Sequence, residues 1–356
     1  MMSDYGDAHH DGDHAHHGSQ APIIVAAGLP FIFIGFITSG WLFLGIGLAI
    51  TAGGLLVWMR EDLGFDGSHE PMAALNPYNN IEIRKVGMWV FLMSEMMVFS
   101  SFFASYVRYR TSIPNCTELF FQLVGSGSQL AGATYNCYEP ASHLIAHNFW
   151  TLAPGAINTF ALIISSYTLV LALVNAKRAN TRKTTMWLSV TLGLGTLFLI
   201  LKLTEWYLGF GTNIPSLQSE GYMLDSMTSG SATAASYQWH GGVLNDVCSA
   251  SMIGAEADTH PFRSGIQNSA DQIAACKHAA HDFNMNIRIS ASLFFITTGT
   301  HGLHVFLGLL MLLYLIYKNM TGRFSPMNAQ GIEYFALYWH FVDLVWVVVF
   351  PAFYLY

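Results

Sequence analysis

The sequence has few charged residues: Asp, Glu, Lys and Arg make up 10% of its 356 residues, whereas 53% are hydrophobic. Soluble domains carry about 25% charged residues, so this deficit is typical of a membrane protein. The 15 Lys and Arg residues form no basic patch with interleaved aromatics, so nucleic acid is not expected as a partner. The chain starts with an acidic, His-rich segment, and we therefore expect no cleavable signal peptide.

Motifs for catalysis are also missing. The sequence has no Gly-rich phosphate loop, no nucleophile elbow and no Cys spacing typical of a metal site. It therefore offers no catalytic residue of its own. Residues 1–20 contain little that could be buried, and we expect a disordered tail on the cytoplasmic side. The histidines of this tail could capture metal, but a solvated tail is the favoured interpretation.

Long hydrophobic runs are present instead. A bilayer core of ~30 Å needs about 20 apolar residues per helix. Pro22–Met59 is too long for one span, and Ile37–Gly40 offers a turn within it. The sequence thus predicts an all-α polytopic membrane protein with seven transmembrane helices, at 22–38, 41–59, 86–107, 149–174, 186–208, 289–317 and 334–356.

The organisation predicted from these spans has three parts: the tail 1–20, the first helix pair at 21–60, and a five-helix bundle at 82–356. Two outer loops, 111–146 and 209–284, interrupt the bundle. Lys and Arg are in excess beside the loops on one side, which predicts a cytoplasmic N-terminus and an outer C-terminus.

All four cysteines then lie on the outer side, where disulfides persist. Four cysteines allow three connectivities. We favour pairing within each loop, Cys116 with Cys137 and Cys248 with Cys276, and leave the other two open.

Glu95 interrupts the apolar run Val86–Val107 near the middle of its predicted span. Ionisable groups at that depth are unfavourable and mark candidate functional sites. Residues at helical spacing from Glu95 are all apolar, so the carboxyl must find a partner on another helix, meet lipid or water, or stay protonated. A hydrogen bond that merely ties two helices is the alternative. Small residues beside it would allow close helix packing: Gly87, Ser94, Ser101 and Ser105.

Polar residues recur at helical spacing in the later spans, and we expect these faces to point into the bundle. Lys202 and Glu205 are three residues apart and close enough to pair. Histidines and a carboxylate on neighbouring helices could hold metal or haem. Interhelical hydrogen bonding is favoured, because only one histidine stands opposite the pair in the sixth span. The other residues of these faces are Asn158, Ser165, Thr297, His301, His304, Glu333, His340 and Asp343.

Five stretches in consecutive order resemble subunit III of the haem–copper cytochrome c oxidases. The strings HGLHV and WHFVDLVW are the most specific of them, and the first two spans are similar only in length and in the ending VWMRED. The family usually has a short connection where this chain has the insert 211–284. The five stretches are 92–107, 153–166, 201–210, 299–308 and 338–356.

The resemblance implies a seven-helix accessory subunit, with helices 1–2 and helices 3–7 around a V-shaped cleft that holds phospholipids. It implies no redox centre in this chain, with haem and copper in partner subunits. The family packs against catalytic subunit I together with subunit II and supports proton uptake during aerobic respiration in an energy-transducing membrane. Glu95 matches the family's glutamate beside the cleft, and Trp58 and Arg60 match residues at lipid headgroups. The outer loop 209–284 would cap the catalytic subunit or dock another respiratory complex.

Three alternatives stay open. The same subunit occurs in quinol oxidases of the family. A proton-coupled membrane transporter could use Glu95 with Lys202 and Glu205 as its path. An intrinsic haem or metal enzyme could use His301, His304 and His340.

Overall fold

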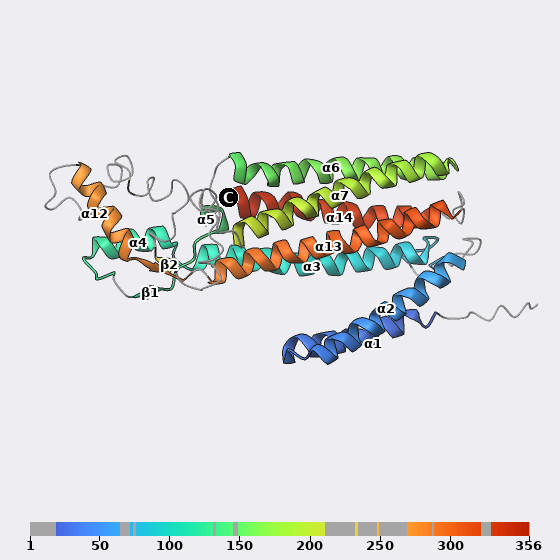
Figure 1. The fold of residues 1–356 in the computed structure, drawn as a ribbon, viewed down its shortest axis with the longest axis horizontal. Coiled ribbons are helices and arrows are strands. Elements are labelled where there is room, and N and C mark those ends of the chain that lie inside the picture. The colour runs from blue at the N-terminus through green and yellow to red at the C-terminus, as the bar shows by residue number, and fades with distance from the viewer. Residues whose placement is uncertain are drawn as a thin grey trace, which may run out of the picture. The chain divides into compact units, whose positions relative to one another are not determined.

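The computed structural model describes residues 19–64, 72–73, 76–130, 133–144, 149–210, 232–233, 248, 269–286, 288–321 and 329–355. Seven helices in this part of the chain are long and apolar enough to cross a membrane. The seven predicted spans are therefore confirmed, with ends a few residues from those expected. The helices are α1 (Ala21–Thr38), α2 (Trp41–Gly64), α3 (Ile83–Ser112), α6 (Phe149–Lys177), α7 (Thr181–Phe210), α13 (Arg288–Met320) and α14 (Gln330–Phe350), the last continued by the π-helix η4 (Pro351–Leu355) (Figure 1).

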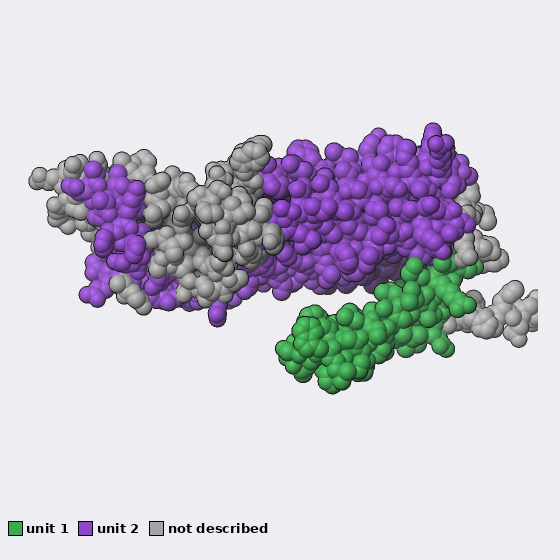
Figure 2. All heavy atoms as spheres, viewed as in Figure 1, with its two compact units in different colours: residues 1–67 green, residues 68–356 purple. Residues whose placement is uncertain are grey.

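The chain divides into two compact units, residues 1–67 and 68–356, coloured separately in Figure 2. The first contains α1 and α2, joined where Ser39 takes the left-handed conformation with φ of 53°. Glycines let the two backbones approach closely: a Cβ added at Gly35 would lie 2.6 Å from Leu44 N, and one at Gly47 would lie 2.6 Å from Ile32 N. Close backbone contact through small residues is a common way to pair transmembrane helices. The predicted tail lies outside the described residues, except for its last two.

The second unit contains the bundle of α3, α6, α7, α13 and α14. Its core follows α14, whose Trp339 and Trp346 are fully buried. The Trp339 ring fits against glycines on two helices, since a Cβ added at Gly195 or Gly308 would lie within 3.0 Å of it. Its Nε1–H donates to Ser165 Oγ at 2.9 Å. The polar faces predicted for the fourth and seventh spans thus meet inside the bundle.

The two outer loops fold together. Helices α4 (Cys116–Gly125) and α12 (Ser269–Asp282) share one hydrophobic cluster, which includes all four cysteines. A small sheet joins the loops: β3 (Asn284–Met285) pairs in parallel with β1 (Thr134–Tyr135) and antiparallel with β2 (Ala232–Thr233). The short helix α5 (Ala141–Leu144) completes the described elements. We call the residues 113–144, 232–233, 248 and 269–286 the outer cap.

Two disulfides hold the outer cap, Cys116–Cys137 and Cys248–Cys276. This is the pairing favoured from the sequence. Each disulfide closes a loop within its own segment, while Phe283 between them stacks on Tyr135, with ring centroids 4.7 Å apart. The cap therefore has its own small core, separate from the core along α14.

Candidate functional site

Glu95 on α3 contacts His304 on α13, with 3.0 Å between Glu95 Oε2 and His304 Nε2. Both side chains are only partly covered, at 19% and 13% exposure. The sequence left several possibilities for Glu95, and the structure selects a partner on another helix. Of the two neighbouring histidines in the sixth span, His304 is the one that faces this carboxyl.

The hydrogen bonds of His304 fix the protons of the pair. His304 Nδ1 lies 2.8 Å from Thr300 O, and a carbonyl can only accept, so Nδ1 carries the hydrogen. His304 Nε2 then either accepts from a protonated Glu95 or, in the imidazolium, donates to a Glu95 carboxylate. Both arrangements place one shared proton between the two groups and leave the pair neutral. Neutrality suits a pair with apolar surroundings, because an isolated buried charge is strongly unfavourable.

Aromatic rings surround the pair. The Phe99 ring lies edge-on to His304, with centroids 5.4 Å apart, and the Tyr338 ring is stacked at 6.5 Å. Tyr338 also donates its O–H to His304 O at 2.8 Å. The residues that contact His304 therefore come from α3, α13 and α14. Of the five helices of the bundle, α3, which carries Glu95, has the smallest buried share of its most apolar stretch, 6%.

Among the described helices of the second unit, none packs against the small-residue stripe next to Glu95. A Cβ added at Gly87 would meet no atom within 4 Å. Ser94 and Ser101 are exposed and Ser105 is partly buried, and all three donate to carbonyls of α3 itself. The other helices of the second unit contact α3 along its Phe99 and Tyr106 face instead, so close packing along the stripe stays a prediction.

His301 takes a different direction from His304. It is fully buried, donates from Nε2 to Val342 O at 3.0 Å, and packs its ring against Trp346 with centroids 5.2 Å apart. Asp343 Oδ2 accepts from Ser166 Oγ at 2.8 Å. Among the residues with described positions, no group of three or more His, Cys, Asp and Glu could hold a metal ion. The half-buried His340, three residues before Asp343, joins no such group.

Lys202 and Glu205 pair inside the bundle, as the spacing predicts. Lys202 Nζ lies 3.1 Å from Glu205 Oε1, and both side chains are buried. Tyr354 accepts from Lys202 and donates its O–H to Glu205 Oε1 at 2.6 Å. The ammonium also lies over aromatic rings, 5.2 Å from the centroid of Trp346 and 5.4 Å from that of Phe294. We call Lys202, Glu205 and Tyr354 the buried ion-pair network.

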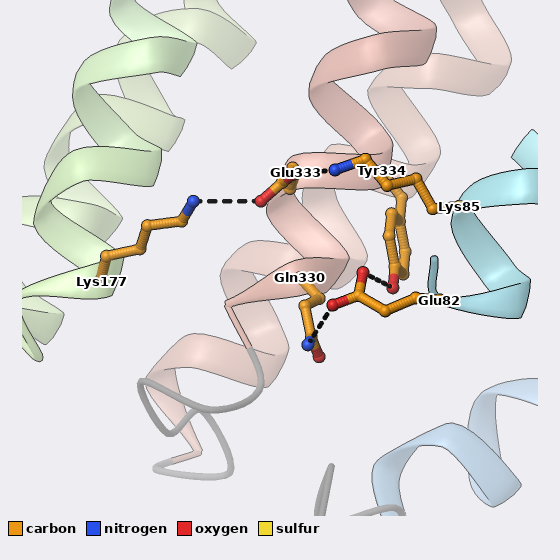
Figure 3. A network of polar contacts seen from close by, with 6 residues as sticks. All are labelled: Glu82, Lys85, Lys177, Gln330, Glu333 and Tyr334. Carbon is orange, nitrogen blue, oxygen red and sulfur yellow. Dashed lines mark hydrogen bonds and ion pairs between the residues drawn. The ribbon is translucent and has the colours of Figure 1, made fainter. Parts of the chain in front are cut away.

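A second ion-pair network closes the opposite end of the bundle (Figure 3). Glu333 lies in the first turn of α14 and pairs with lysines of two other helices. Its Oε1 lies 2.6 Å from Lys85 Nζ on α3, and its Oε2 lies 3.1 Å from Lys177 Nζ on α6. Beside it, Glu82 accepts from Gln330 Nε2 and from Tyr334 Oη. Helical spacing puts Glu333 on the face of His340, and it does not predict the partners of Glu333. The signal was available, because Lys85, Lys177 and Glu333 all stand at span ends on the same side of the predicted membrane.

Trp58 and Arg60 lie on α2 in the other compact unit, and both are exposed. The structure places neither with Glu95, so their predicted contact with lipid headgroups stays a prediction. The same holds for the V-shaped cleft.

The chain is similar to a known protein family and to several known proteins. A family model described as cytochrome c oxidase subunit III matches residues 270–356, which contain His301, His304, His340 and Asp343. The chain is 26% identical to the heme-copper oxidase subunit I+III of Aeropyrum pernix over 98% of this chain and 32% of that protein. It is 24% identical to the probable quinol oxidase subunit 3 of Staphylococcus epidermidis over 77% of this chain and 89% of the relative.

A third relative is the cytochrome c oxidase subunit 3 of Synechocystis, 41% identical over 75 residues, which are 21% of this chain and 32% of the relative. The matched parts thus span about a third of the Aeropyrum and Synechocystis proteins. The resemblance read from the five sequence stretches is confirmed. The seven apolar helices and this relationship together indicate an integral membrane protein.

Proposed function

We propose that this chain, which belongs to the haem–copper oxidase subunit III family, is the accessory subunit III of a respiratory terminal oxidase. The oxidase would reduce oxygen to water with electrons from cytochrome c and couple this reaction to proton pumping. Haem and copper would reside in partner subunits I and II, and this chain would contribute no redox centre. The match to the family over 270–356 supports the proposal most directly, since that segment supplies His304, the partner of Glu95.

The role proposed for this chain is to support proton uptake and bind lipid at Glu95. A neutral Glu95–His304 pair can hold one proton, and its partial exposure on α3 gives it access to the surroundings of the bundle. Phospholipid headgroups would contact Trp58 and Arg60 at the end of α2. The membrane would be an energy-transducing one, with the N-terminus on the cytoplasmic side and the C-terminus outside.

A quinol oxidase is the second candidate, and one observation favours it. The relatives named as quinol oxidase subunit 3 align over most of their length, 89% for the Staphylococcus protein, whereas the Synechocystis cytochrome c oxidase subunit aligns over 32%. Purified assembly should be assayed for oxygen consumption with reduced cytochrome c and, separately, with a quinol. Turnover with the quinol alone would replace the primary proposal by this one.

The experiment that tests the proposed function is purification through an affinity tag on this chain, followed by an optical spectrum and identification of the co-purifying proteins. The expected result is a set of haem absorption bands together with a catalytic oxidase subunit. A tagged chain that purifies without any haem protein, and that moves protons or solutes in vesicles, would instead favour the transporter alternative.

The outer cap is proposed to contact partners, either the catalytic subunit or another respiratory complex through the loop 209–284. Lys277 on α12 is exposed and offers a crosslinking site there, and exposed Lys183 on α7 provides a matched control at the opposite end. In native membranes, crosslinks from Lys277 to oxidase subunits or to another complex are expected. Crosslinks from Lys277 only to this chain would contradict the proposal.

A further inference from the structure

The interior of the bundle holds polar side chains that the proposed function does not use, at the level of Trp346 on α14. His301 on α13 and Lys202 on α7 both lie against the Trp346 ring, at 5.2 Å each. Thr297 lies one turn before His301 on the same helix, between it and Phe294, which lies under the Lys202 ammonium. These contacts bring Thr297, His301 and the buried ion-pair network to one region.

Asn158 on α6 reaches the same level from the other side. The helices α6 and α14 run in opposite directions: a Cβ added at Gly155 would meet the Phe350 ring, and Ser165 accepts from Trp339. Asn158 lies between these two contacts on one helical face, opposite the part of α14 that carries Trp346. The neighbouring Thr159 Oγ1 accepts from Trp346 Nε1 at 3.1 Å, so this part of α6 lies beside Trp346.

Several polar atoms in this region have no hydrogen-bond partner among the described residues. They are both amide atoms of Asn158, the Thr297 hydroxyl, His301 Nδ1 and Glu205 Oε2. Asn158, Thr297 and His301 are each 0% exposed. A buried polar atom without a partner is unfavourable, and such groups in folded proteins are usually satisfied by protein or ordered water.

The chemistry of these atoms points to a neutral ligand that both donates and accepts. The Asn158 amide nitrogen is a donor, its oxygen and Glu205 Oε2 are acceptors, and a hydroxyl can do either. His301 Nδ1 is an acceptor, because Nε2 carries the hydrogen given to Val342 O. A cation would meet the Lys202 ammonium and the amide donor, and an anion would meet the carboxylate and His301 Nδ1. Water fits both kinds of partner.

We propose that ordered water is bound inside the bundle at the level of Trp346, held by Asn158, Thr297, His301 and Glu205. This site is separate from the Glu95–His304 pair and does not depend on the proposed function. It accounts for the burial of the ion-pair network, since water bound to Glu205 Oε2 satisfies the carboxylate oxygen that neither Lys202 nor Tyr354 reaches.

The direct test is a cryo-electron microscopy map of the purified, unmodified assembly at a resolution that shows ordered water. The expected result is density within about 3.2 Å of at least two of the atoms named above. A map that shows water on surface groups and none here would overturn the proposal. The density for water is judged independently of haem content. An assembly without haem would therefore contradict the proposed function and leave the test of the water site unaffected.

A pair of adjacent substitutions gives a second test. Thr297→Val removes a hydroxyl that the proposal assigns to water, and it should lower the unfolding temperature of the purified assembly by about 2–4 °C. Thr298→Val is the matched control, because Thr298 is equally buried but donates to Phe294 O of its own helix at 2.7 Å, and little change is expected. If the Thr297 hydroxyl is simply unsatisfied, Thr297→Val will raise the unfolding temperature or leave it unchanged, and the proposal fails.

Discussion

Glu95 and Glu205, two carboxylates that have partners within membrane helices, lie in contrasting parts of the bundle. Glu205 is buried with Lys202 on α7, where 28% of the most apolar stretch is covered by the chain. Glu95 lies on α3, where only 6% is covered, and its partner is a histidine that can be neutral. From this contrast we expect the loss of one member of the buried pair to affect helix packing more than the loss of Glu95, for which we propose proton exchange or lipid contact.

The largest effect is expected when the buried pair loses one member. Lys202→Met would leave the Glu205 carboxylate buried without its ammonium, and breaking a buried pair in this way destabilises by about 3–5 kcal/mol. Denaturant unfolding of the purified assembly, followed by loss of helix signal, would measure it.

The control for that substitution is the double variant Lys202→Met with Glu205→Gln, which removes both charges and should recover most of the loss. If Lys202→Met alone has no effect on unfolding, the buried pair does not stabilise the packing and the contrast between the two carboxylates disappears.

A smaller effect is expected at the partly exposed pair. His304→Phe removes the hydrogen-bond partner of Glu95, and an unsatisfied group of this kind is unfavourable by about 1–3 kcal/mol, less where water reaches it. Glu95→Gln should change stability less, because the amide can still donate to His304 Nε2. A double-mutant cycle of His304→Phe with Glu95→Leu, in which each change removes the contact, measures the coupling directly. Additive effects would show that the contact between Glu95 and His304 contributes nothing.

The smallest effect is expected at the ion-pair network of Glu333, Lys85 and Lys177. Glu333 is 25% exposed and its partners Lys85 and Lys177 are 28% and 56% exposed, so water and salt screen these pairs. Glu333→Gln should destabilise by about 1 kcal/mol or less, and the difference should shrink further at high salt. An effect as large as that of Lys202→Met, independent of salt, would mean that this network is far better shielded than its exposure indicates.

The sequence was sufficient for the seven spans, because each apolar run has the length that a bilayer requires. It also indicated that Glu95 has no partner on its own helix, which left a partner on another helix, lipid or water, or a protonated carboxyl as possibilities. It could not name His304, because helical spacing gives the face of a residue but not the neighbour that packs against it. His301 and His304 are a single turn apart, yet one contacts α14 and the other α3.

The outer cap shows the same limit. Two loops separated by two membrane helices share one cluster and one sheet, and strands of two residues leave no periodic signal in the sequence. The ion-pair network of Glu333 was partly predictable, since the sequence puts Lys85, Lys177 and Glu333 at span ends on the same side of the membrane. Their direct contact was not predictable, because it depends on how α3, α6 and α14 pack together.

The most direct test of the central claim is Glu95→Gln in the complete assembly, with haem content and the durability of oxygen consumption measured on the same preparation. We predict that haem absorbance per assembly and the initial rate stay close to those of the parent, because no redox ligand is lost. The activity should decay sooner during turnover, or bound phospholipid should be lower, because the shared proton of the pair is gone. Loss of haem, or durability and lipid content identical to the parent, would contradict the account.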